Sequence, residues 1–177
     1  MAFATVSDLA THLKAALSAE DTATATQALD LATAFIKTYI GQELEAVDNR
    51  VQVFRGRNLN ALILNELPIR AIDSVTVDTV AFTDYDIELK EGIIYRNDDL
   101  GCTSWNAFEK VVVTYDSGFT TIPPTLKMIC LHVAAREFAA PTHWSSEGIG
   151  NYNRVAESDS AGAFTKGERA LLHRYRP

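Results

Sequence analysis

The stretch from Val111 to Pro141 constrains the fold most, because a strand, a turn and an apolar helix follow one another in it without a spare residue. Residues 111–115 are β-branched or aromatic, which favours a strand. Gly118 suits a turn, and Pro123 or Pro124 has the fixed φ that a first helical turn tolerates. From Leu126 onward, apolar residues recur at helical spacing around most of the circumference. A helix so apolar is normally packed on several sides, so we expect it to be the core helix.

Helical periodicity predicts three further helices. Residues 5–18 form a first short helix, and residues 22–40 form a second that ends at Gly41, a residue common at helix C-termini. In the C-terminal stretch, Thr165 and Glu168 have the spacing of a capping box and precede an apolar run. The chain is therefore expected to have two helices before the core helix and one after it.

Between the second helix and the core helix, residues 50–115 are rich in β-branched and aromatic residues. The clearest strand is 85–89, where apolar and charged residues alternate with a period of two. The predicted fold class is α+β: a mainly helical bundle of two N-terminal helices, a central apolar helix and a C-terminal helix, with a small antiparallel β-sheet inserted between helices 2 and 3. The length of 177 residues favours a single domain, residues 1–177.

The segment 142–163 has no usable periodicity and exceeds ordinary loop lengths. It nevertheless contains large apolar residues, which would serve little purpose on a free linker. We interpret it as a long interaction loop that docks onto another subunit through Trp144, Ile149, Tyr152 and Val155.

The chain is acidic overall, and its acidic and basic residues are concentrated in different segments of the sequence. A net charge of −7 argues against a general nucleic-acid binder, which is usually basic. Residues 84–99 hold six acidic and two basic side chains, a net of −4, whereas residues 164–177 hold four basic and one acidic, a net of +3. Because this tail also carries Leu171, Leu172 and Tyr175 at helical spacing, we favour insertion into a protein groove with arginines on its rim. Contact with phosphates stays open as the alternative.

The sequence argues against secretion, membrane insertion and several kinds of catalytic or metal site. We see no secretory leader in the sequence, and its two cysteines come with no other sign of secretion, so we expect the protein to be made and used in a reducing cytoplasm. No stretch reaches the roughly 18 apolar residues that a membrane span needs, so we expect no membrane association. The four histidines form no metal-ligand pair at helical spacing, and no phosphate loop, dinucleotide fingerprint or nucleophile elbow is present. Asp84, Asp86 and Glu88 are interpreted as the solvated face of a strand rather than as acid–base groups, and His132 as a structural residue. We predict no catalytic, cofactor or metal site, and no enzyme.

The order of motifs resembles a known family. Two N-terminal helices are followed by the motifs LNELPI at 64–69, VTV at 75–77, a strand with Tyr85, GII at 92–94, VTYDSG at 113–118, IP at 122–123 with its helix, and ERALLHRYR at 168–176. This series is similar to the head-to-tail adaptor proteins, also called head-completion or connector proteins, of long-tailed double-stranded DNA bacteriophages. The similarity covers nearly the whole chain.

The resemblance implies a structural virion protein that is made in the host bacterial cytoplasm. Such a protein forms a ring with its own copies, commonly twelve-fold, beneath the portal protein, joins capsid to tail, receives a stopper or tail-completion protein, and lines a channel through which DNA passes without specific binding. It also implies that the C-terminal docking helix, residues 164–177, reaches the portal through Arg169, Leu171, Leu172, Arg174, Tyr175 and Arg176.

Two other functions compete with the adaptor. One is a small phage or bacterial protein-binding module without a place in a ring, and the other is an enzyme. Loss of an activity on substitution of Asp84, Asp86 or His132 would favour the enzyme.

Overall fold

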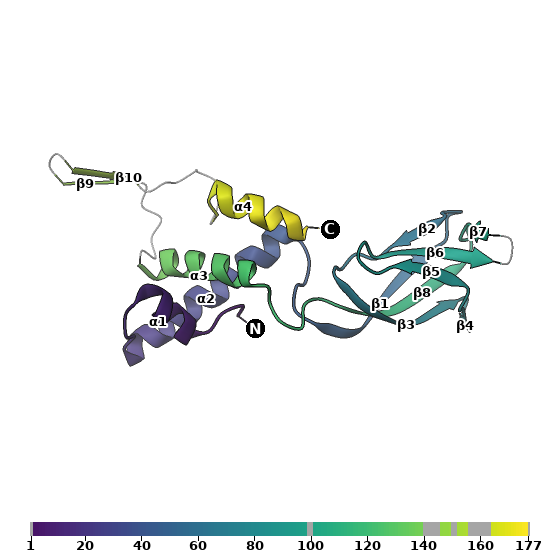
Figure 1. The fold of residues 1–177 in the computed structure, drawn as a ribbon, viewed down its shortest axis with the longest axis horizontal. Helices are drawn as coiled ribbons and strands as arrows, with labels where there is room; N and C mark the ends of the chain where they lie inside the picture. The colour runs from purple at the N-terminus through teal and green to yellow at the C-terminus, as the bar shows by residue number, and fades with distance from the viewer. Residues whose placement is uncertain (1, 99–100, 140–145, 150–151, 156–163, 177) are drawn as a thin grey trace. The chain divides into compact units, whose positions relative to one another are not determined.

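The strands from Val47 to Ser117 follow one another between the second and third helices, and a separate pair of strands lies between the third and fourth helices (Figure 1). The computed structural model describes residues 2–98, 101–139, 146–149, 152–155 and 164–176. They divide into two compact units, a helical unit made of residues 1–41 and 122–176 and a β unit made of residues 42–121. Each unit has its own core.

The helical unit is built from four α-helices and a closing 3₁₀ turn. They are α1 (Val6–Leu13), α2 (Ala19–Ile40), α3 (Pro124–Ala139), α4 (Lys166–Leu172) and the turn His173–Tyr175. Capping boxes begin α1, α2 and α4, with Thr5, Ser18 and Thr165 as the N-cap residues. The first helix is shorter than predicted, because Lys14 adopts a left-handed conformation and ends it.

The core helix predicted from the sequence is α3. Ile129, Cys130 and Ala134 on this helix are fully buried, and α1, α2 and α4 all contact it. The facing stripe of α2 begins with alanines, of which Ala25 and Ala32 are fully buried, so α2 and α3 approach closely. The helical unit is therefore organised around α3, as the apolar run from Leu126 indicates.

The β unit contains two antiparallel sheets. The first has the strand order β1-β8-β3-β4, and the second has the order β2-β6-β5 with β7 paired to β6. The strands are β1 (Val47–Arg55), β2 (Ala61–Ile63), β3 (Ile69–Val77), β4 (Val80–Ala81), β5 (Tyr85–Glu88), β6 (Ile93–Asp98), β7 (Gly101–Thr103) and β8 (Lys110–Ser117). The predicted strands 85–89 and 111–115 correspond to β5 and β8.

The two sheets share one core. Residues from both sheets form a single buried cluster, in which Trp105 and Tyr115 are the largest side chains. Phe82 packs edge-on against Trp105, with 5.5 Å between the ring centroids. The β unit is thus two sheets packed face to face, with a core that the helices do not supply.

This arrangement corrects the predicted fold. The class α+β is right, but a mainly helical bundle with a small inserted sheet is wrong, because the strands form two four-stranded sheets in a compact unit of their own. The sequence between residues 50 and 115 reveals strands by their alternation, but not how those strands divide between sheets. Two sheets burying one face each leave the same alternation as one sheet on a helical bundle.

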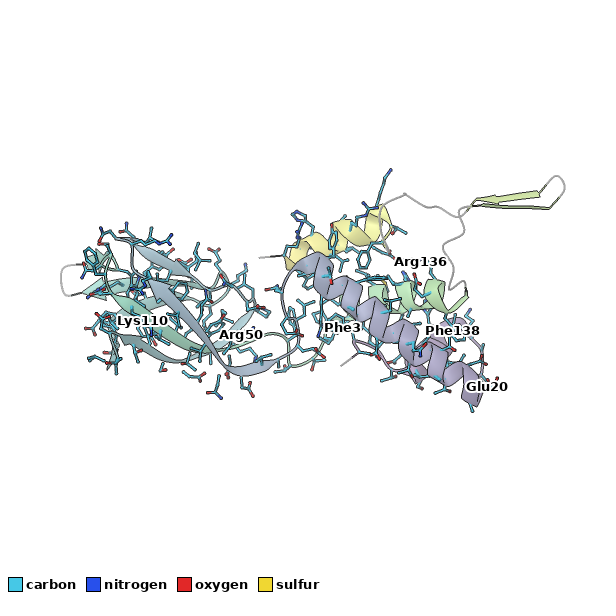
Figure 2. The ribbon with its side chains drawn as sticks, turned by 180° about the vertical axis from the view of Figure 1, so that it is seen from behind. Phe3, Glu20, Arg50, Lys110, Arg136 and Phe138 are labelled. Carbon is cyan, nitrogen blue, oxygen red and sulfur yellow. The ribbon has the colours of Figure 1, made fainter. Side chains whose placement is uncertain are left out.

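The chain enters and leaves the β unit at the same end. In the pairing of β1 with β8, Val47 lies opposite Ser117 and Arg55 lies opposite Lys110. Figure 2 shows Arg50 and Lys110 toward opposite ends of the unit. The end that carries Arg55 and Lys110 is therefore remote from the two connections to the helical unit.

The segment predicted as a long loop contains a hairpin. Strands β9 (Ser146–Ile149) and β10 (Tyr152–Val155) pair antiparallel and form a two-stranded sheet of their own. The two strands, with the sequences SEGI and YNRV, do not alternate between apolar and polar residues, so no strand period is visible in the sequence. Trp144, which we expected to anchor this segment, lies outside the described residues.

Candidate interaction sites

The C-terminal helix α4 is packed into the helical unit. Leu172 is fully buried, and the Phe164 side chain that precedes the helix is 7% exposed. The Phe164 ring lies edge-on against Tyr39 of α2, with 5.5 Å between centroids. Leu172, one of the residues predicted to dock onto a portal, therefore belongs to the core of the helical unit in this conformation.

Glu168 holds the start of α4 against α3. Its carboxylate accepts hydrogen bonds from both terminal nitrogens of Arg136, each at 2.9 Å, and from the backbone N–H of Thr165 at 2.8 Å. Arg136, labelled in Figure 2, projects from α3 toward α4. Burial alone would raise the pKa of Glu168, but the hydrogen bonds from Arg136 and Thr165 outweigh it and lower the pKa below its ordinary value of 4.5. The pair is charged at neutral pH and fixes the position of α4.

The other residues that we predicted to dock onto a portal differ in how exposed their side chains are. Arg174 and Arg176 are exposed, whereas Arg169, Leu171 and Tyr175 are half-buried. The guanidinium of Arg176 lies 5.4 Å from the centroid of the Tyr39 ring, and Nε of Arg169 donates to the Phe164 carbonyl at 3.2 Å. Arg174 is thus the predicted docking residue best placed to meet a partner without unpacking α4.

Three of the four residues predicted to contact a neighbouring subunit, Ile149, Tyr152 and Val155, lie on the hairpin. Ile149, the last residue of β9, pairs directly with Tyr152, the first of β10, and Val155 pairs with Ser146 at the other end. The structure therefore brings Ile149 and Tyr152 together, a proximity that their spacing in a supposed loop does not predict.

The β unit carries an apolar groove that the sequence analysis missed. The groove has a volume of about 430 Å³ and is lined by β1, β2 and the connection between them. Its apolar side chains include Val53, Leu59 and Ile63, which are 55%, 49% and 63% exposed. Arg55 and Arg57 also line it. The alternation of Val51 and Val53 with polar residues indicates a strand, but it does not say that the apolar face is the one left open.

One side chain next to the groove joins β1 to the segment around β2. The Oε1 atom of Gln52 in β1 accepts hydrogen bonds from the Asn65 backbone N–H at 3.1 Å and from the Tyr115 hydroxyl at 3.0 Å. Its Nε2 atom donates to the Ile63 carbonyl at 3.5 Å. Gln52 therefore joins β1 to the segment around β2, whereas backbone pairing between β1 and β2 is absent from the described sheets.

The groups considered for chemistry have ordinary roles in the structure. Asp84, Asp86 and Glu88 are exposed, and Asp86 accepts a hydrogen bond from the Asn97 side chain at 2.9 Å. Nδ1 of His132 lies 3.6 Å from Oε1 of Glu168, the carboxylate that holds α4. Within the described residues, no group of three His, Cys, Asp or Glu side chains is arranged to hold a metal ion. None of their helices is long and apolar enough to cross a bilayer.

Comparison with known proteins gives a structural likeness only. No family model and no curated protein matches the sequence. Among solved structures, the chain is similar to a protein in the neck of an empty gene transfer agent (GTA) particle, computed with C6 symmetry. The identity is 18%, the TM-score is 0.55, and the match covers 97% of this chain and 88% of the other. At this identity the likeness establishes a shared fold along nearly the whole chain.

Proposed function

We propose that this chain is a structural protein of the head–tail neck of a phage-like particle. The observation that carries the proposal is the fold shared with a neck protein over 97% of the chain, including both units. The match is to a protein that is itself a component of an assembly, which favours an oligomeric, non-enzymatic role. The order of motifs in the sequence leads to the same class of protein independently.

Within the neck, we propose a ring that docks beneath a portal. The likeness is to a neck computed with C6 symmetry, and a twelve-fold ring is compatible with that symmetry. Docking on a preformed portal raises the effective concentration of neighbouring subunits, so a weak contact between subunits is sufficient. A stopper or tail-completion protein would then bind the opposite face of the ring.

The C-terminal segment is the proposed portal contact. The packing of α4 into the helical unit limits which of its residues can reach the portal. Because Leu172 is fully buried and Glu168 is paired with Arg136, α4 presents its outer face and the residues after it. Arg174 is exposed at that position. We therefore assign the main portal contact to Arg174, with Leu171 and Tyr175 beside it, rather than to the whole helix.

The acidic balance of the chain suits a channel wall. At a net charge of −7, like charge disfavours adsorption of DNA on the surface of the ring, so DNA can pass without being held. This part of the proposal predicts weak DNA binding that does not depend on sequence.

The proposal is tested on particles made from the genome that encodes this chain. We expect mass spectrometry of purified particles to detect the protein, and gold label on an affinity tag at its N-terminus to lie at the head–tail junction. Label on the capsid faces or the tail tube, or absence of the protein from particles, would reject a neck role and leave a binding module outside the particle.

A further inference from the structure

The free edge of strand β1 is the least protected edge of the β unit. Edge strands with unpaired N–H and C=O groups invite pairing with another strand, and proteins usually blunt them with charge, shortness or bulges. Edge strand β4 has two residues, and edge strand β5 has exposed Asp86 and Glu88. By contrast, β1 runs for nine residues and leaves Val51 and Val53 more than half exposed.

The hydrogen-bond register shows which backbone groups of β1 are open. The N–H of Gly56 donates to the Glu109 carbonyl, so these residues form a hydrogen-bonded pair at the end of the β1–β8 ladder. Such pairs alternate along an antiparallel ladder. The backbone groups of Val51, Val53 and Arg55 therefore point away from β8, toward the unpaired side. Three consecutive outward-facing positions suit the addition of a short strand.

The same reasoning applies to β2 across the groove. The N–H of Leu64 donates to the Gly92 carbonyl, so the backbone groups of Ala61 and Ile63 point away from β6. The Ile63 carbonyl already accepts a hydrogen bond from Gln52, so the side of the groove near Gln52 is partly occupied. An extended segment can thus enter from the end that carries Arg55, beside the exposed side chains of Val53 and Leu59.

The β9–β10 hairpin has properties that suit it to pair with the free edge of β1. It is a sheet of only two strands, and an isolated hairpin of this size is marginally stable in water. The paired strands hold Glu147 and Arg154, a net of zero, and the stretch that follows β10 adds Glu157 and Asp159, whereas two arginines line the groove. The hairpin also contains apolar residues at both ends of the paired strands, which match an apolar groove.

We propose that the β9–β10 hairpin of one copy of this chain pairs with the free edge of β1 in a neighbouring copy and covers the groove. This inference rests on the proposed ring, and it names the surfaces that would join the subunits. Main-chain hydrogen bonds to β1 provide the affinity, and the apolar groove with Arg55 and Arg57 provides the specificity. Because the hairpin and the groove are different surfaces, each copy donates one and accepts another, a heterologous contact that forms a ring when the rotation between copies closes.

The length of chain around the hairpin allows this exchange. Six residues, 140–145, lie between the end of α3 and the start of β9, and ten residues, 156–165, lie between the end of β10 and the start of α4. Even the shorter connection can span up to roughly 20 Å. The hairpin can therefore be handed to a neighbour while α3 and α4 keep their packing in the donor.

Cross-linking between two singly labelled chains tests the pairing. One chain carries Val53→Cys and the other Tyr152→Cys, both with Cys102→Ser, while the buried Cys130 is kept. A bifunctional maleimide spanning roughly 10 Å, about two strand spacings, tolerates a shift in register. The reaction is run with portal rings from the same genome and also with the isolated protein at its highest soluble concentration. We expect a cross-linked heterodimer, and a ladder of oligomers when both cysteines are in one chain.

Matched variants make the result specific. Val80 on β4 is 68% exposed on the other edge of the same sheet, so a Val80→Cys chain paired with Tyr152→Cys is the control. We expect at least about tenfold less product from the control, and a similar loss when Ile63→Asp is added to the Val53→Cys chain, because a carboxylate is then buried by the hairpin.

Three outcomes would overturn the pairing. They are equal product from the Val80 control, a purely intramolecular product in the doubly substituted chain, and no product in either condition. Sedimentation with portal rings is recorded in the same samples. Chains that sediment with the portal but do not cross-link refute the hairpin exchange alone, whereas chains that cross-link without sedimenting refute the portal contact alone.

Discussion

Removal of the C-terminal segment is expected to destabilise the helical unit strongly, although that segment has the sequence character of a free docking tail. A chain that ends at Ala163 lacks Phe164 and Leu172, which are 7% and 0% exposed. Each such side chain stabilises the folded state by about 1.5–3 kcal/mol. The Glu168–Arg136 pair adds about 1 kcal/mol, a modest value because the Arg136 side chain is 43% exposed. The total loss is about 4–7 kcal/mol, close to the whole stability of many domains, about 5–15 kcal/mol.

Hydrogen exchange of the full chain and the truncated chain measures this loss separately in each unit. We expect amides of α2 and α3 to lose most of their protection, while amides of β3 and β8 keep theirs, because the β unit has a core of its own. A chain that ends at Leu172 is the control. It keeps Phe164 and Leu172, and it loses the half-buried Tyr175 together with the contact between Arg176 and Tyr39, the latter worth about 0.5–1 kcal/mol. Unchanged protection of α2 and α3 in the chain ending at Ala163 would refute the packing described for α4.

Two further predictions concern single residues. Glu168→Gln is expected to lower the free energy of unfolding by about 1 kcal/mol at neutral pH. The folded pKa of Glu168 lies below 4.5, so its contribution to the free energy of unfolding is complete above about pH 4.5 and is lost as the pH falls through the folded pKa. Denaturation at several pH values should therefore show the free energies of unfolding of the two proteins becoming equal in acid. A difference in free energy that stays constant with pH would contradict this. Gly118→Ala is expected to destabilise the β unit severely, because φ is +83° and the new Cβ would lie 2.1 Å from the Glu45 carbonyl oxygen. Gly41→Ala is the control: its φ is +84° but the space around it is open, so the free energy of unfolding should fall by only about 1–2 kcal/mol. Equal thermal shifts for the two alanine variants would argue against the close approach at Gly118.

The sequence predicts the helices better than the β unit for a physical reason. The apolar face of α3 is wide enough to require packing on several sides, and capping residues mark the starts of three helices. Strand pairing, in contrast, depends on partners far apart in the chain, such as β1 with β8. Alternation gives each strand two faces but does not assign either face to a core, so the second sheet could not be predicted.

The candidate sites show the same limit. The arginines after α4 are visible in the sequence as a basic cluster, and Arg174 is indeed exposed. The burial of Leu172 is not visible, because a helical face that packs into its own unit has the same spacing as one that docks onto a partner. The groove beside β1 leaves no local signature at all, since it forms where the edges of two sheets meet.

Co-sedimentation with purified portal rings from the same genome tests the central claim most directly. The samples are the full chain, Arg174→Glu, and Lys90→Glu as a control with the same change of charge at another exposed position. Point substitutions are preferred to truncation because they leave the packing of α4 intact. We predict that the full chain and Lys90→Glu sediment with the rings and that Arg174→Glu does so at least about tenfold less. Failure of the full chain to bind would contradict a neck role beneath the portal, and equal binding of all three would move the contact away from the C-terminal segment.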